Sequence, residues 1–122
     1  MFKKLRTVIY HVQDMNKAKE WYKNITGINP YFNEPFYVGF DINGCELGLD
    51  PDFTNVDDGN QSVAYWSVDD IEVAFDMLVQ NNATVISPIT GVGEGIKVAV
   101  LKDPFGNAIG LIEEVTGNTN LT

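Results

Sequence analysis

The chain has 122 residues, 44% of them hydrophobic, and a formal net charge of -9 at pH 7. Its seven Phe and five Tyr residues can build the core of one domain, or of two small halves, without disulfides, and the single Cys45 cannot form one within the chain. We see neither a signal peptide nor an apolar run near the ~18 residues of a membrane span, and therefore expect a cytoplasmic protein. The negative charge argues against nucleic-acid and membrane partners and suits a cationic ligand, although an acidic surface also serves solubility alone.

In chain order, the first feature is a strand–Asp–helix unit that occurs twice, in residues 7–28 and 63–85. Asp14 and Asp70 are suited to the N-cap of a helix, because a carboxylate accepts the free backbone N–H groups of the first turn. Apolar residues follow each Asp at a spacing of three or four, which predicts a helix with one apolar stripe in each half. The stripes are Met15, Ala18, Trp21, Tyr22 and Ile25 in the first half, and Ile71, Ala74, Phe75, Leu78 and Val79 in the second.

Strands and turns account for most of the remaining residues. Gly27 should end the first helix, and Asn81-Asn82 the second. Asn43-Gly44 predicts a two-residue hairpin, because both turn residues need a positive φ. The predicted strands are 7–12, 36–42, 45–50, 63–68, 83–88, 95–102 and 108–114, the polar segment 51–61 is the expected linker, and 116–122 is an expected tail. The order is β-α-β-β-β, written twice.

The segment Asp103-Pro104-Phe105-Gly106-Asn107-Ala108-Ile109-Gly110 resembles the strand–turn–strand signature Asp-Pro-x-Gly-Asn-x-x-Glu of the glyoxalase, bleomycin-resistance and extradiol-dioxygenase (vicinal-oxygen-chelate) superfamily. Trp21-Tyr22 before Thr26-Gly27, and Val68-Asp69-Asp70, also resemble that family. The resemblance covers residues 5–115 and implies a single α+β domain of two βαβββ modules, about 5–50 and 62–115. It further implies curved mixed sheets around a shared cavity, helices outside, and a homodimer.

Strand parity predicts which side chains line the cavity, because alternate residues of a strand point to opposite sides of its sheet. The helix-covered face should hold Val8, Tyr10, Val12, Phe36, Val38, Phe40, Leu47 and Leu49, with Ala64, Trp66 and Val68 in the second module. The concave face should hold Thr7, Ile9, His11, Tyr37, Gly39, Asp41, Glu46, Gly48 and Asp50, with Val63, Tyr65 and Ser67. Tyr37 and Tyr65 are then stacking candidates, and Gly39, Gly48 and Gly110 should leave room for a ligand.

The resemblance assigns the family's four metal-binding positions to Thr7, Val63, Gly110 and Glu46, with Gly48 in place of Glu46 if the strand register is shifted. Thr is a poor ligand for a divalent ion, and Val and Gly side chains offer no donor. Glyoxalase chemistry and extradiol ring cleavage both need a metal, so we expect neither reaction and no metal or other cofactor.

His11, the only His, admits several interpretations. It is an acid–base candidate if the protein is an enzyme, a hydrogen-bonding or structural residue otherwise, or a metal ligand together with Asp41 and Glu46. Cys45 falls on the helix-covered face, so we expect it in the core rather than as a nucleophile.

Two classes of function follow. The first is a metal-independent binding protein that sequesters a cationic, planar antibiotic or metabolite. Its expected ligand-binding residues are Thr7, Ile9, His11, Tyr37, Asp41, Glu46, Tyr65, Ser67 and Gly110. The second is a lyase, isomerase or dioxygenase-like enzyme of the same superfamily, with a relocated metal or with His11 as its acid–base residue. A regulatory ligand sensor is also compatible with these residues.

Overall fold

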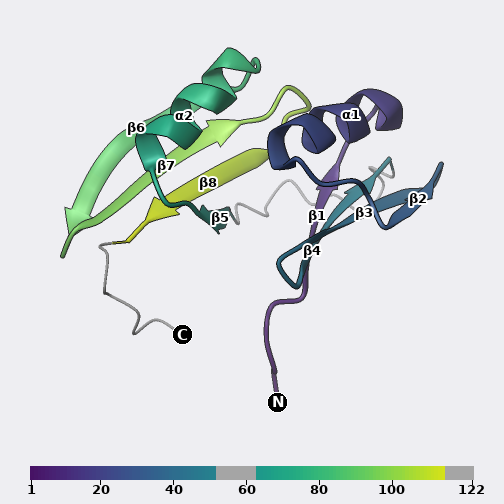
Figure 1. Cartoon of the computed structure of the whole chain (residues 1–122), viewed down its shortest axis with the longest axis horizontal. Coiled ribbons are helices and arrows are strands. Elements are labelled where there is room, and N and C mark those ends of the chain that lie inside the picture. The colour runs from purple at the N-terminus through teal and green to yellow at the C-terminus, as the bar shows by residue number, and fades with distance from the viewer. Residues whose placement is uncertain (52–62, 115–122) are drawn as a thin grey trace. The chain divides into compact units, whose positions relative to one another are not determined.

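The computed structural model describes residues 1–51 and 63–114, and the chain divides between residues 61 and 62 into two compact units, here called the first and second modules. Both have the order β-α-β-β-β (Figure 1), which confirms the predicted fold class. The predicted tail, and the predicted linker apart from Pro51, lie outside the described residues. The first module contains β1 (Thr7–His11), α1 (Met15–Thr26), β2 (Phe32–Glu34), β3 (Tyr37–Ile42) and β4 (Cys45–Asp50). The second contains β5 (Ala64–Ser67), α2 (Ile71–Gln80), β6 (Thr84–Gly93), β7 (Ile96–Lys102) and β8 (Ala108–Glu113).

Each module folds into a four-stranded mixed sheet, with strand orders β1-β4-β3-β2 and β5-β8-β7-β6. The first and last strands of a module pair in parallel, and the other neighbours are antiparallel. Helix α1 packs against β3 and β4, and α2 packs against β6, β7 and β8, so each helix covers one face of its own sheet. The other face of each sheet is the one predicted to be concave. The predicted shared cavity stays a prediction.

The helix ends follow the capping chemistry expected from the sequence. The Asp14 side chain accepts a hydrogen bond from the Lys17 backbone N–H at 3.0 Å, and the Asp70 side chain caps α2 in the same way. Gly27 has a φ of 70° and donates its backbone N–H to the Lys23 carbonyl at 2.8 Å. Both N-caps and the glycine stop of α1 are therefore confirmed.

The core of each module lies between its helix and its sheet. The buried apolar residues are Tyr10, Val12, Ala18, Tyr22, Val38, Phe40, Leu47 and Leu49 in the first module, and Ile71, Leu78, Ala99, Leu101, Ile109 and Leu111 in the second. Most of the predicted helix-covered face is thus confirmed. Phe36 was predicted to be buried, but it precedes β3 and is 65% exposed. Val79 is 42% exposed at the last turn of α2, and Cys45 is only half-buried beside the hairpin turn.

The family-like motif forms the tight turn between β7 and β8. Asp103 is 3% exposed, and its Oδ1 atom accepts hydrogen bonds from the backbone N–H groups of Phe105 at 2.9 Å and Asn107 at 2.7 Å. Gly106 has a φ of 96°, a conformation that L side chains rarely adopt. The motif residues therefore build this turn.

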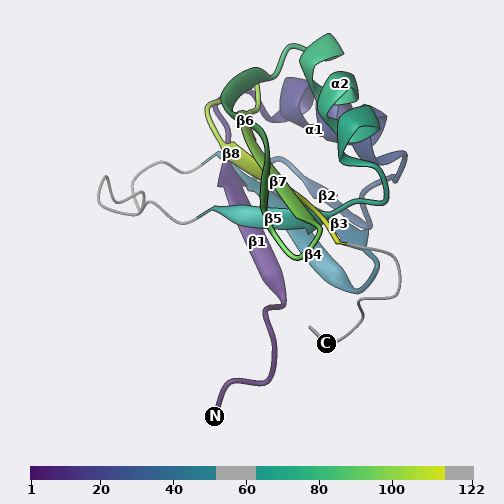
Figure 2. The same cartoon turned by 90° about the vertical axis from the view of Figure 1, so that its left-hand side faces the viewer.

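Residues 1–6 precede β1 and belong to no helix or strand (Figure 2). The segment is exposed, but its last residue is anchored, because the Arg6 carbonyl accepts a hydrogen bond from the Glu46 backbone N–H at 2.8 Å. No helix within residues 1–51 and 63–114 has the length and hydrophobicity needed to cross a membrane.

Candidate functional site

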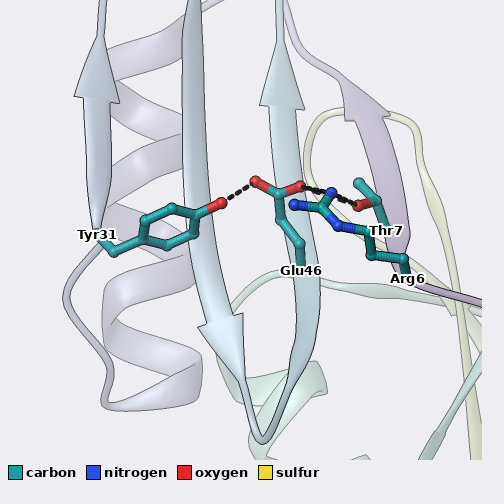
Figure 3. A network of polar contacts seen from close by, with 4 residues as sticks. All are labelled: Arg6, Thr7, Tyr31 and Glu46. Atoms are coloured by element: carbon teal, nitrogen blue, oxygen red, sulfur yellow. Dashed lines mark hydrogen bonds and ion pairs between the residues drawn. The ribbon is translucent and has the colours of Figure 1, made fainter.

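Glu46, on β4, is the centre of a network of polar contacts in the first module (Figure 3). Its Oε1 atom accepts hydrogen bonds from Thr7 Oγ1 at 2.9 Å and from Arg6 Nη1 at 3.2 Å. Its Oε2 atom accepts a hydrogen bond from the Tyr31 hydroxyl at 2.5 Å. Because the Glu46 side chain is only 11% exposed, these donors replace much of the water that a free carboxylate would hold.

Strand register positions this carboxylate and its neighbours. Thr7 lies opposite Glu46 in the parallel pair β1–β4, and Asp41 lies opposite it in the antiparallel pair β3–β4, as the hairpin turn predicts. Asp41 Oδ1 accepts the backbone N–H of Gly44 at 2.9 Å, so this carboxylate also stabilises the turn. Arg6 offsets part of the negative charge of the Asp41–Glu46 pair.

Tyr31 reaches Glu46 across the same face of the sheet, from the β2 edge. It lies just before β2, and its backbone N–H donates to the Gly39 carbonyl on β3 at 3.0 Å. Figure 3 shows its ring crossing β3 toward Glu46, while Arg6 approaches the carboxylate from the side of β1. A pocket of about 210 Å³ lies between these elements, lined by Arg6, Tyr31, Asp41, Gly44 and Glu46.

Gly39 and Gly48 are paired at the centre of this face, and neither leaves the open space predicted for it. A Cβ atom at Gly39 would lie 2.7 Å from Glu46 Oε2 and 3.2 Å from Tyr31 Cε1. A Cβ atom at Gly48 would collide with the hydroxyl and the Cζ atom of Tyr37. The two glycines therefore make room for side chains of the protein itself.

Electrostatics keep the carboxylate charged and the phenols neutral. The hydrogen bond from Tyr31 lowers the pKa of Glu46 below its usual value, burial opposes this, and Thr7 and Arg6 lower it further. Burial is the main cause that raises the pKa of Tyr37 to about 12, and Glu46 adds to it. The hydrogen bond to Glu46 likewise raises the pKa of Tyr31. At neutral pH the network therefore holds an ionised Glu46 between two protonated tyrosines.

Exposed aromatic and aliphatic side chains border the network. Phe32 pairs with Gly39, which places its side chain on the same face as the glycine position, and it is 38% exposed. Its ring lies 6.0 Å from that of Phe36 and 6.1 Å from that of Tyr37, measured between centroids. Ile9 on β1 shares this face and is 46% exposed. The face thus combines a charged carboxylate with aromatic surface.

In the second module, Tyr65 lies over Gly110. The two residues are opposite each other in the parallel pair β5–β8, and a Cβ atom at Gly110 would lie 2.6 Å from Tyr65 Cδ1. The space predicted at Gly110 is therefore filled by this ring, which remains half-exposed. Ser67 is exposed opposite Ile112, and Val63 is half-buried just before β5.

The four positions at which the resemblance implies metal ligands do not fit a metal ion. Val63 and Gly110 carry no donor atom, and the Thr7 hydroxyl donates its hydrogen bond to the one remaining carboxylate, Glu46. Within the described ranges, no group of three or more His, Cys, Asp or Glu side chains could hold a metal ion.

His11 lies away from the Glu46 network. It is half-buried at the end of β1, opposite Asp50 and four residues along the strand from Thr7, which corresponds to about 13 Å. The alternative metal site of His11, Asp41 and Glu46 was therefore wrong, because Asp41 and Glu46 pair with each other at the opposite end of the sheet.

Two members of the network were not anticipated from the sequence. Arg6 precedes the first strand, and Tyr31 lies in a segment for which no strand was predicted. Strand parity assigns a face only to residues within a strand, so it could not place either side chain. One signal was available: a Glu46 carboxylate that points to the concave face needs hydrogen-bond donors nearby.

Comparisons with known proteins agree with this architecture. The model of the Glyoxalase/Bleomycin resistance protein/Dioxygenase superfamily matches residues 4–111. A glyoxalase/bleomycin resistance protein/dioxygenase family enzyme from Burkholderia phytofirmans PsJN has a similar structure, with a TM-score of 0.78 at 16% identity, covering 93% of this chain and 100% of that one.

Two further structures show the same fold at low identity. For a lactoylglutathione lyase from Agrobacterium tumefaciens the TM-score is 0.71 at 15% identity, with 90% of this chain and 92% of that one covered. For TioX from Micromonospora sp. ML1 the TM-score is 0.71 at 15% identity, with 93% of this chain and 100% of that one covered. No curated protein matches the chain. Since the family model spans nearly the whole chain, the protein belongs to the Glyoxalase/Bleomycin resistance protein/Dioxygenase superfamily.

Proposed function

We propose that the protein binds, without a metal ion and without chemistry, a planar cationic small molecule such as an antibiotic or a metabolite. The observation that carries the proposal is the ionised Glu46 at the pocket in the first module, with exposed aromatic rings beside it. A carboxylate attracts the cationic group, and the faces of Tyr and Phe rings attract both cations and flat aromatic surfaces.

The size of the pocket restricts how such a ligand would sit. At about 210 Å³ it is smaller than the ~300–1,000 Å³ typical of sites that enclose a drug-sized molecule. It therefore suits one cationic group of the ligand, with the planar remainder lying over Tyr31 and Phe32, which are 60% and 38% exposed. The net charge of -9 would favour the approach of such a ligand.

Two further parts belong to this proposal, a homodimer from the family resemblance and a cytoplasmic location from the sequence. The protein forms a homodimer, which light scattering coupled to size-exclusion chromatography would test, and it works in the cytoplasm. Sequestration of a toxic cation by a binding protein needs only an affinity high enough to lower the free concentration, so no catalytic residue is required.

Titration with proflavine, a planar aromatic cation, followed by fluorescence anisotropy, tests the proposal. We expect Glu46→Gln to weaken binding by about 10-fold or more, because a hydrogen bond to a charged group is worth ~1.5–3 kcal/mol. Glu20→Gln, at a side chain of α1 that is 66% exposed, removes the same charge from the helix-covered side of the module and should leave the affinity unchanged. Absence of saturable binding to the wild-type protein, or equal affinity of Glu46→Gln and wild type, would contradict the proposed function.

A further inference from the structure

The contact between Arg6 and Glu46 differs from the other contacts of the carboxylate. The Arg6 side chain is 72% exposed, whereas that of Glu46 is 11% exposed. A single guanidinium nitrogen, Nη1, makes both side-chain contacts of Arg6, at 2.8 Å to Thr7 Oγ1 and 3.2 Å to Glu46 Oε1. The bidentate geometry that makes Arg–carboxylate pairs strong is therefore not used.

The network does not depend on Arg6 for its geometry. If the guanidinium leaves, Glu46 Oε1 keeps the hydrogen bond from Thr7, and Oε2 keeps the one from Tyr31. The backbone of Arg6 also stays in place, because its carbonyl accepts the N–H of Glu46. Only the exposed side chain would move, and what it uncovers is an oriented, ionised carboxylate at the wall of the pocket.

From this geometry we infer that the Arg6 side chain is an internal occupant of the cation position at Glu46, and that a cationic ligand binds by displacing it. The inference rests on the proposed function and specifies the ligand class further. A guanidinium or amidinium group can form two hydrogen bonds to a carboxylate. When such a group displaces Arg6, Glu46 exchanges a contact with one nitrogen for a paired contact with two. A quaternary ammonium, which has no N–H, gains nothing by the exchange.

For an anionic ligand, the Arg6 side chain would have the opposite effect on binding. Arg6 would then attract the ligand, and its removal would weaken binding. The sign of the effect of an Arg6 substitution therefore distinguishes displacement from recruitment. It also separates both from a contact that only stabilises the fold, for which ligand affinity would not change.

Methylguanidinium, which reproduces the end of the Arg side chain, is the probe for this test. Its binding would be followed by the 13C chemical shift of Glu46 Cδ at constant ionic strength, in the wild type, Arg6→Gln and Lys4→Gln. Lys4→Gln is the matched control, because it removes one positive charge from the same exposed segment. We expect Arg6→Gln to bind more tightly than wild type by up to about 5-fold, as the loss of an exposed competitor worth up to ~1 kcal/mol implies, and Lys4→Gln to match wild type.

Each outcome decides the inference. Tighter binding by Arg6→Gln alone supports it. Equal or weaker binding by Arg6→Gln overturns it, and so does a Glu46 signal that fails to respond in that variant, because the uncovered carboxylate would then accept no guanidinium. The proflavine titration of the wild type is separate, so a protein that binds proflavine but shows no Arg6 effect keeps the proposed function and loses the displacement mechanism.

Discussion

Substituting Gly110 by Ala should destabilise the protein clearly more than substituting Gly48, although both glycines lie on the predicted concave face. At Gly110 the added Cβ atom would lie 2.6 Å from Tyr65 Cδ1, 2.8 Å from Tyr65 Cγ and 2.9 Å from the backbone oxygen of Ala64. Two of these atoms are near the root of a side chain or in the main chain, and they cannot move without shifting β5. At Gly48 the three nearest atoms all belong to the outer end of Tyr37, which can rotate away.

The magnitude follows from two opposing terms. Overpacking a site that cannot relax costs typically 1–3 kcal/mol, whereas replacing Gly by Ala stabilises a strand by roughly 0.4–1 kcal/mol through the unfolded state. We therefore expect Gly110→Ala to lower the free energy of unfolding by about 1–2 kcal/mol, and Gly48→Ala by less than ~1 kcal/mol.

Urea unfolding at pH 7 measures both effects. Gly91→Ala is the control, because a Cβ atom there meets nothing within 4 Å. Adding Tyr65→Ala to Gly110→Ala should restore only part of the lost stability, since the Ala64 oxygen still obstructs. A free energy of unfolding for Gly110→Ala within ~0.5 kcal/mol of the Gly91→Ala value would refute the steric reasoning, because surface substitutions stay within this range.

Two more predictions concern titration and metal binding. The folded pKa of Tyr37 is raised to about 12, so its contribution to stability is fully present below pH ~10 and is lost as the pH rises toward 12. Two pKa units correspond to ~2.7 kcal/mol, which solvent screening of this partly exposed ring reduces to about 1 kcal/mol. Between pH 9 and pH 12, the free energy of unfolding in urea should fall by that much more for wild type than for Tyr37→Phe. Equal decreases in the two proteins would contradict the raised pKa of Tyr37. Gly110→Glu should bind neither zinc nor nickel stoichiometrically by calorimetry, because Thr7 and Val63 remain non-ligands; tight binding would show that these positions are misassigned.

Local chemistry allowed much of the fold to be predicted. The helix starts at Asp14 and Asp70, and the register that places Asp41 opposite Glu46, follow from capping and turn rules that involve only neighbouring residues. Strand β2 was counted but not located, because Phe32–Glu34 is a three-residue edge strand whose side chains are all exposed, so it has no alternating pattern.

The candidate site was less predictable, for a different physical reason. Parity correctly gave the face of Gly48, and the family resemblance gave the position of Gly110, but neither says how far a neighbouring side chain reaches across that face. Tyr37 and Tyr65 extend over these glycines, so positions expected to be empty are filled. Arg6 reached the site from outside any strand, where a periodic pattern carries no information.

The parallel pairing of β1 with β4, and of β5 with β8, has a consequence for biosynthesis. Among the described residues, the first strand of each module has one hydrogen-bonded neighbour, and that neighbour is the last strand of the same module to leave the ribosome. Thr7 cannot meet Glu46 until about forty residues of chain have followed it, so each sheet closes late and through contacts of long sequence separation. During translation, β1 and β5 therefore stay unpaired until β4 and β8 emerge. The rate at which a nascent module becomes resistant to proteolysis should be governed by the emergence of its final strand.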